Sequence, residues 1–153
     1  MPTQNATPTD AQLILQLYDL RRESEMRKAR NFLFDFWPES AQDVINVFMN
    51  FGSQENAWIR QVGGYWEMAA SLVVRGALNP DLFFDSNGEM FFIYAKFHPF
   101  LKELREHFQE PGIFANVEKL VQSTPEGRDR LQRILTRQSE FRARFKKQGT
   151  AAA

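Results

Sequence analysis

The sequence predicts an all-α fold, a compact bundle of six to eight helices with a long N-terminal helix and a basic C-terminal helix. Three observations carry this prediction. Apolar residues recur at helical spacings of three and four along most of the chain. The breaks between these runs hold helix caps, glycines and prolines. No segment alternates apolar and polar residues between hairpin turns, as a half-buried strand would.

The first helix is expected over residues 10–36, after a flexible tail at residues 1–8. Thr9 and Gln12 have the spacing of a capping box. No glycine or proline interrupts the segment before Pro38, which favours one continuous helix. Its apolar stripe comprises Leu13, Leu17, Leu20, Met26, Ala29, Leu33 and Phe36.

Two further helices should follow, one from Ser40 to about Gly52 and one from Ser53 to Gly76. The second of these contains Gly63-Gly64 in its middle, and each interior glycine costs about 1 kcal/mol relative to alanine. Close packing of a neighbouring helix or a kink should therefore compensate.

The second half of the chain is divided by strong helix signals. A cap and a proline at Asn79-Pro80 begin a short helical turn, which stops at Asn87-Gly88. An aromatic segment from residue 89 follows, and Pro99 should separate it from a helix over residues 100–108.

Two helices are predicted after Pro111-Gly112. One covers residues 113–122, and the last begins at Thr124-Pro125 and runs to about residue 147. Residues 9–147 are thus expected to form a single helical domain, with a second flexible tail at residues 148–153.

Composition excludes several classes of protein. The chain has no cysteine, which rules out a disulfide-stapled domain, a thiolate zinc site and thiol catalysis. Lys and Arg total 19, and so do Asp and Glu, so no net field attracts nucleic acid or anionic lipid to the whole protein. No apolar run reaches the roughly 18 residues of a transmembrane segment, and the N-terminus lacks the features of a secretory signal. We therefore expect a cytoplasmic protein.

Motifs for catalysis or cofactor binding are missing from the sequence. It contains no nucleophile elbow, P-loop or dinucleotide fingerprint. Glu103 and His107 could share a metal, but a di-iron bundle needs Glu-x-x-His on two helices. We expect no cofactor, no metal and no catalytic residues, and consider an enzyme the less favoured class.

Charge is segregated along the chain. From residue 125 onward there are eight basic and three acidic residues, a net charge of +5, while 11 basic and 16 acidic residues leave the remainder at −5. A basic helix could bind nucleic acid or anionic lipid, or pair with acidic residues of its own fold or of a second subunit. The candidate basic-surface residues are Arg130, Arg133, Arg137, Arg142, Arg144 and Lys146.

Glu67 is an acidic residue in an otherwise apolar helix. If that face is buried, its carboxylate needs a partner, for which Arg30, Arg60 and Arg75 are candidates. A structural ion pair is one interpretation, and a functional carboxylate is the other. In the second case the candidate ligand-pocket residues are Trp58, Tyr65, Trp66 and Glu67.

Six of the 15 phenylalanines lie between Phe83 and Phe100. Phe83-Phe84 and Phe91-Phe92 are adjacent pairs, and neighbours on a helix point about 100° apart. One apolar stripe cannot bury both members of a pair. This segment should therefore be central to the fold, or part of it should contact a partner.

The middle of the chain carries a recognisable set of residues: Gly64, Tyr65, Trp66, Glu67, Leu72, Val73, Gly76, Leu78, Asp81, Leu82, Phe83 and Phe84. With these residues it resembles a bacterial family of small helical proteins of unknown function. The similarity covers about residues 60–110. It implies a helical fold and a bacterial source, and it supplies no activity or catalytic residue.

These features favour a non-enzymatic helical module that self-associates or binds a protein partner. The reasons are the zero net charge, the opposed charges of the two segments and the surplus of aromatic residues. Two alternatives stay open: binding of nucleic acid or anionic lipid through the last helix, and a small-ligand pocket or active site around Glu67.

Overall fold

The computed structural model describes residues 4–151, and the all-α prediction is confirmed there: these residues form helices and no strand. No helix within this range is both long and apolar enough to cross a membrane. The elements are α1 (Pro8–Arg22), α2 (Ser24–Asp35), α3 (Ala41–Met49), α4 (Gln54–Val74), α5 (Pro80–Ser86), α6 (Gly88–Phe97), the short 3₁₀ helix η1 (His98–Phe100), α7 (Leu101–Phe108), α8 (Ala115–Gln122) and α9 (Pro125–Ala151).

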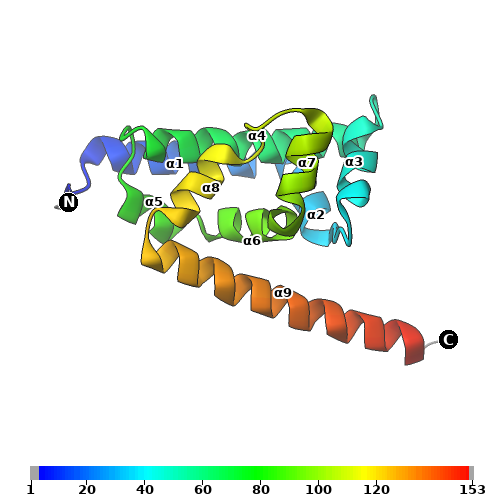
Figure 1. The fold of residues 1–153 in the computed structure, drawn as a ribbon. Coiled ribbons are helices and arrows are strands. Elements are labelled where there is room, and N and C mark those ends of the chain that lie inside the picture. The colour runs from blue at the N-terminus through cyan, green and yellow to red at the C-terminus, as the bar shows by residue number, and fades with distance from the viewer. Residues whose placement is uncertain (1–3, 152–153) are drawn as a thin grey trace.

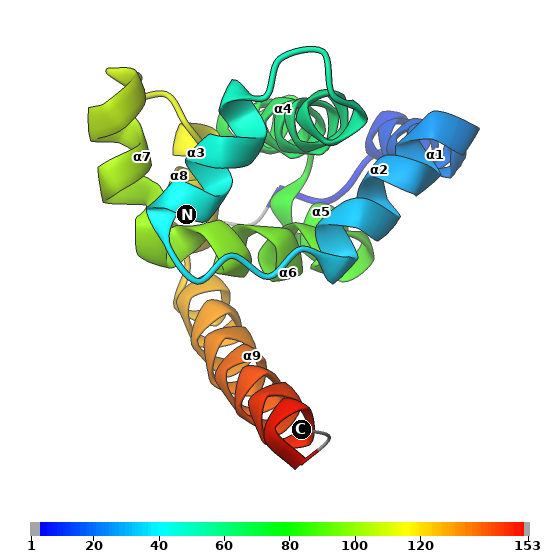
Figure 2. The ribbon, with the colours of Figure 1, turned by 90° about the vertical axis from the view of Figure 1, so that its right-hand side faces the viewer.

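Helix α4 organises one layer of the bundle, since α2, α3 and α8 all pack against it. Helix α6 crosses the opposite side of the body, where α9 packs on it and on α8 (Figures 1 and 2). Figure 1 shows α9 as a long rod on the outside of the bundle, diverging from the body toward the C-terminus. Its first half is therefore anchored, while its second half borders the body on one side only.

The segment expected as one helix over residues 10–36 is two helices in the structure. Glu23 separates them: its backbone turns away with ψ 142°, and its carboxylate accepts hydrogen bonds from the backbone N–H groups of Glu25 (3.1 Å) and Met26 (2.9 Å). This glutamate therefore caps α2, although glutamate is a good helix former and its presence in the sequence does not predict a cap. The capping box of α1 also lies earlier than predicted, because Thr7 pairs with Asp10.

The aromatic segment is central to the fold. Seven of the ten residues of α6 are buried, and Phe83 and Phe91 have exposed fractions of 0% and 1%. Phe84 and Phe92, the other members of the two pairs, are partly buried and pack against the same core. Because α6 is covered by α9 on one side and by the rest of the bundle on the other, both of its faces can be apolar.

Gly63 and Gly64 lie in an α4 that continues without interruption from Gln54 to Val74. A Cβ at Gly63 would meet only the ring of Phe114, at 3.8 Å, and one at Gly64 would meet nothing within 4 Å. The expected close packing of a neighbouring helix is therefore absent at these two positions. The glycines instead leave a surface hollow above the helix backbone.

The ends of the chain differ in part from expectation. Helix α9 continues to Ala151, past the predicted boundary at residue 147, and α1 begins at Pro8. Within the two predicted tails, residues 1–3 and 152–153 lie outside the described part of the chain.

Candidate functional site: an aromatic groove beside the C-terminal helix

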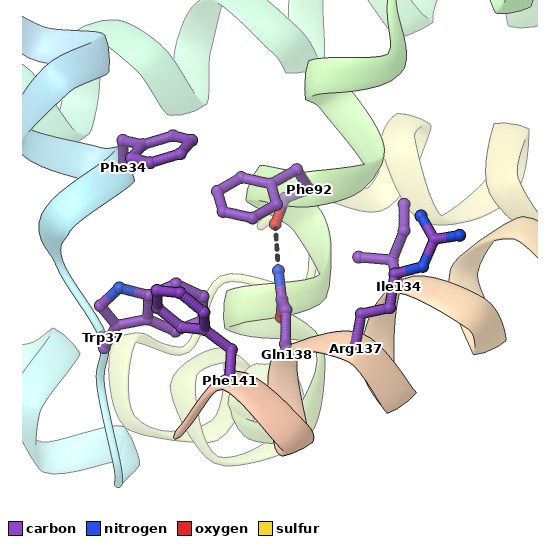
Figure 3. Close-up of a pocket in the computed structure, with 7 residues that line it drawn as sticks. All are labelled: Phe34, Trp37, Phe92, Ile134, Arg137, Gln138 and Phe141. Atoms are coloured by element: carbon purple, nitrogen blue, oxygen red, sulfur yellow. Dashed lines mark hydrogen bonds between the residues drawn. The ribbon is translucent and has the colours of Figure 1, made fainter. Parts of the chain in front are cut away.

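An open, apolar hollow of about 270 Å³ lies between α9, α6 and the end of α2, and we call it the aromatic groove (Figure 3). Trp37 comes from the linker between α2 and α3, and Phe92 from α6. Helix α9 supplies the remaining wall with side chains spaced three and four residues apart, which places them on one helical face. The lining residues are Phe34, Trp37, Phe92, Ile134, Arg137, Gln138 and Phe141.

Ring contacts hold the aromatic walls in place. The rings of Phe34 and Phe92 stack with centroids 5.1 Å apart, and Trp37 meets Phe92 edge-on at 5.9 Å. Phe141 extends from α9 across the groove toward Trp37, and the centroids of the two rings are 5.1 Å apart. Phe34 is still 59% exposed and Phe141 42% exposed, so the rim of the groove offers large aromatic surfaces to solvent.

Gln138 fixes α9 against α6 at the floor of the groove. It is buried, and its Nε2 donates a hydrogen bond of 3.0 Å to the backbone carbonyl of Phe92 (Figure 3). A buried amide needs such a partner, because leaving it unpaired would cost roughly 1–3 kcal/mol. The sequence places Gln138 on the apolar face of the last helix, and this hydrogen bond explains why a polar residue is tolerated there.

Lys96 lies directly behind the aromatic wall. It is fully buried, and its Nζ donates hydrogen bonds to the carbonyls of Leu33 (2.6 Å), Phe34 (2.6 Å) and Phe36 (3.0 Å), the C-terminal carbonyls of α2. All three protons of the ammonium group are used, so Lys96 caps α2 from another helix. The sequence signal for this role is a single lysine within a run of buried aromatic residues.

The amino group of Lys96 also contacts aromatic rings. Its Nζ lies 4.0 Å from the ring centroid of Trp37 and 4.9 Å from that of Phe92. Burial, and to a smaller extent the positive charge of Arg142, lower the pKa of Lys96 to about 7, while the carboxylate of Asp35 opposes both effects. Two walls of the aromatic groove are thus rings whose inner faces contact a cation.

The predicted basic-surface residues divide into two groups. Arg130 packs over the ring of Phe91 and donates a hydrogen bond to the carbonyl of Phe84 (3.0 Å), while Arg142 packs over Trp37 with its guanidinium carbon 5.4 Å from the ring centroid. These two arginines therefore pack α9 against the rest of the bundle. The exposed members of the set are Arg133, Arg137 and Arg144, and the side chain of Lys146 lies outside the described part of the structure.

A second open hollow, of about 320 Å³, lies over the two glycines of α4, and we call it the glycine groove. Glu67 lines it, and its carboxylate accepts hydrogen bonds from the Asn116 backbone (2.8 Å), the Asn116 side chain (2.7 Å) and the Val117 backbone (3.2 Å). Its partner is therefore the N-terminus of α8, where an acidic group also complements the helix dipole. The complete lining is Phe48, Ile59, Arg60, Gly63, Gly64, Glu67, Glu110, Gly112, Ile113 and Phe114.

Helix α8 needs this outside cap because of its first residues. Phe114, at its N-cap position, has φ 52° in the left-handed region and makes no side-chain capping hydrogen bond. This capping role takes the place of the structural ion pair considered for Glu67. Of the candidate partners, Arg30 pairs with Glu89 at 2.6 Å and Arg60 donates a hydrogen bond of 3.1 Å to Asn56 Oδ1.

The four candidate ligand-pocket residues are not brought together. Trp58 packs against Phe32, with ring centroids 5.8 Å apart. Tyr65 donates a hydrogen bond of 2.7 Å to the carbonyl of Leu17, and Trp66 is fully buried against Tyr65. Of the four, Glu67 lines the glycine groove and the other three do not.

Metal-ligand types do not cluster in the described part of the chain, where no group of three or more His, Asp or Glu side chains could hold an ion. Glu103 and His107 are both exposed on α7. His98 is partly buried, and its Nδ1 lies 3.2 Å from the hydroxyl of Tyr94.

Comparison with known proteins identifies the family. The family model of a domain of unknown function, DUF4760, matches residues 6–124, which is most of the chain. The chain belongs to this family. The match confirms the resemblance to a small helical family of unknown function that the middle of the sequence indicated. No curated protein and no solved structure matches.

The matched residues of this DUF4760 chain end just before α9 begins at Pro125. The aromatic groove therefore has one wall from the matched part, with Phe34, Trp37 and Phe92, and one wall from α9. The glycine groove lies wholly within the matched residues.

Proposed function

We propose that this DUF4760 protein is a non-enzymatic helical module that self-associates or binds a protein partner through the aromatic groove. The observation that carries the proposal is the exposed aromatic rim of a concave apolar surface, with Phe34 59% and Phe141 42% exposed. Large aromatic side chains around a hollow are typical of the anchor sites of protein interfaces. Isolated exposed apolar residues would not support this, but these two border the same groove.

The distribution of charge supports a protein partner over a polyanion. Of the basic residues predicted on α9, Arg133, Arg137 and Arg144 are exposed, but Arg130 and Arg142 pack on aromatic rings of the body and interrupt the basic surface. A surface for nucleic acid or anionic lipid would keep such cations exposed in a row. The acidic remainder of the chain, with its net charge of −5, also offers a second copy a surface complementary to α9.

Sedimentation equilibrium and light scattering test the self-association half of the proposal. We expect the wild-type chain to show a concentration-dependent increase in mass up to high micromolar concentration, and the double variant Phe34→Ala/Phe141→Ala to remain monomeric. Phe51→Ala is the matched control, because Phe51 is 73% exposed and does not line the groove. A wild-type chain that stays monomeric contradicts self-association, and then a different protein remains as the proposed partner.

A further inference from the structure

We infer that the occupant of the aromatic groove is an amphipathic helix of a protein partner that carries acidic side chains beside its apolar anchors. This inference rests on the proposed function, because it assumes that the groove is the interaction surface. It goes further by stating the shape and the charge of the partner, which the apolar lining alone does not specify.

The shape of the groove favours a helix. Ile134, Gln138 and Phe141 stand on α9 at positions i, i+4 and i+7, so one wall is a straight helical face. The opposite wall is formed by Phe34, Trp37 and Phe92. A helix laid beside α9 would place its own anchors, spaced three and four residues apart, into the hollow between these walls.

The charge around the groove favours acidic groups on that helix. Two arginines border it, Arg142 over the ring of Trp37 and Arg137 in the lining. Lys96, behind the rings of Trp37 and Phe92, adds positive charge below its pKa of about 7. Lys96 is bonded to backbone carbonyls, so its charge is not cancelled by a hydrogen-bonded carboxylate.

The acidic groups near these cations are fewer. Asp35 interacts with Lys96, and Glu140 stands on α9 beside a separate hollow that Arg133 and Arg137 also line. The groove therefore presents an apolar centre within a positive surrounding, which attracts acidic residues on the flank of an incoming helix.

The concave form of the surface argues against a membrane as the occupant. Aromatic residues that enter a bilayer project from the protein, whereas here Trp37 and Phe92 line a hollow and only the rim is strongly exposed. A flat lipid surface would leave this hollow unfilled, while the side chains of a helix can fill it.

Two designed peptides of equal length test the inference. Both carry Leu and Phe anchors at positions i, i+3, i+4 and i+7, and the positions that flank the anchors are Glu in one peptide and Lys in the other. Each is labelled with fluorescein, and its anisotropy is followed as the full chain is added. We expect the Glu peptide to bind about tenfold or more tightly than the Lys peptide at low salt, with the difference shrinking as NaCl is added.

Variants of the chain locate the effect. The triple variant Arg133→Glu/Arg137→Glu/Arg144→Glu changes Arg137 in the lining and two further exposed arginines of α9, and it should reverse the preference toward the Lys peptide. Phe141→Ala should weaken binding of both peptides. The matched control is Arg22→Glu/Arg27→Glu/Arg75→Glu, which changes the net charge equally at exposed arginines that are not on α9 and do not line the groove, and it should keep the preference for the Glu peptide. Circular dichroism confirms that each variant is folded.

The outcomes separate the inference from the proposed function. Equal affinity for both peptides, or a reversed preference in the control triple variant, overturns the acidic helix and leaves the groove as an interaction surface. Tighter binding to phosphatidylserine vesicles than to the Glu peptide overturns it in favour of a lipid surface. If neither peptide binds, and the variant Phe34→Ala/Phe141→Ala has the same mass in solution as the wild-type chain, the proposed function fails as well.

Discussion

The aromatic groove and the glycine groove are similar in size, at about 270 and 320 Å³, and each is supported by a charged residue that caps a helix from across the fold. Lys96 holds the C-terminus of α2, and Glu67 holds the N-terminus of α8. The difference is where the charge lies. Lys96 is fully buried behind the rings that line its groove, whereas Glu67 is half-buried and lines its groove directly.

This difference decides what each hollow can offer to a partner. Because Lys96 lies behind the wall, its hydrogen bonds are made away from the groove, and the rings of Trp37 and Phe92 line the groove itself. The carboxylate of Glu67 is already occupied by three hydrogen bonds from α8. Lys96 therefore supports the wall of the aromatic groove from behind. Glu67 lies in the wall of the glycine groove, but its hydrogen bonds to α8 leave it fewer lone pairs for a ligand.

Removing the buried ammonium group should give the largest effect. Lys96→Met keeps the length of the side chain but leaves the carbonyls of Leu33, Phe34 and Phe36 without their donor. We expect the free energy of unfolding to fall by about 3 kcal/mol, measured by urea denaturation, since each unsatisfied buried group costs roughly 1–3 kcal/mol. Lys102→Met on the exposed face of α7 should change it by less than about 0.5 kcal/mol. A loss no larger than that of the control would contradict the capping role.

The same lysine should make stability rise with pH above neutrality. Burial lowers its pKa to about 7 from an ordinary 10.5, so between these values the unfolded chain binds more protons than the folded one. The free energy of unfolding should then increase with pH, by at most about 1.4 kcal/mol per unit for one group. Urea midpoints at pH 7, 8 and 9 measure this, and Lys96→Met should show no such rise.

Above about pH 10 the trend should reverse. Burial raises the pKa of Tyr65 to about 12 and also raises that of Tyr94, so the unfolded chain loses these phenolic protons first. Stability should therefore fall with pH in this range, in the wild type and in Lys96→Met alike. A wild-type profile that is flat from pH 7 to 9 would contradict the role of Lys96.

Removing the Glu67 cap should lower the free energy of unfolding by less than removing Lys96 does. Glu67→Ala removes the acceptor at the N-terminus of α8, and loss of an N-cap typically lowers the free energy of unfolding by about 0.5–2 kcal/mol. Glu67→Gln keeps one acceptor oxygen and should lose less. Glu106→Ala, at an exposed position on α7, is the control. Unchanged thermal unfolding of Glu67→Ala would show that α8 does not need this carboxylate.

A side chain added at the floor of the glycine groove should change stability least, and it should raise stability rather than lower it. Gly64→Ala adds a Cβ that would meet nothing within 4 Å, so the helix should gain up to about 1 kcal/mol in calorimetric stability. Gly127→Ala is the contrasting variant, because its Cβ would collide with the carbonyl of Val121 and should destabilise the protein. Destabilisation by Gly64→Ala would show that the groove closes on α4 in solution.

Local signals in the sequence predicted several helix boundaries correctly. Ser40 forms a capping box with Asp43 at the start of α3, and Asn79-Pro80 begins α5. Thr124-Pro125 likewise begins α9. Each signal works within one helical turn, where a side chain and the backbone it caps are neighbours in the chain. The break at Glu23 was missed because a glutamate cap carries no such distinctive residue type.

By itself, the sequence determined the all-α class, most helix boundaries, the segregated charge and the aromatic density of the segment around α6. Only the tertiary structure decided how the charged residues are used. Lys96 reaches a carbonyl 63 residues away, and Glu67 reaches an amide 49 residues away. Helical periodicity shows which face of a helix is apolar, but not which distant helix end will lie against it. Such pairings depend on packing of the whole bundle, and that packing also opens the aromatic groove.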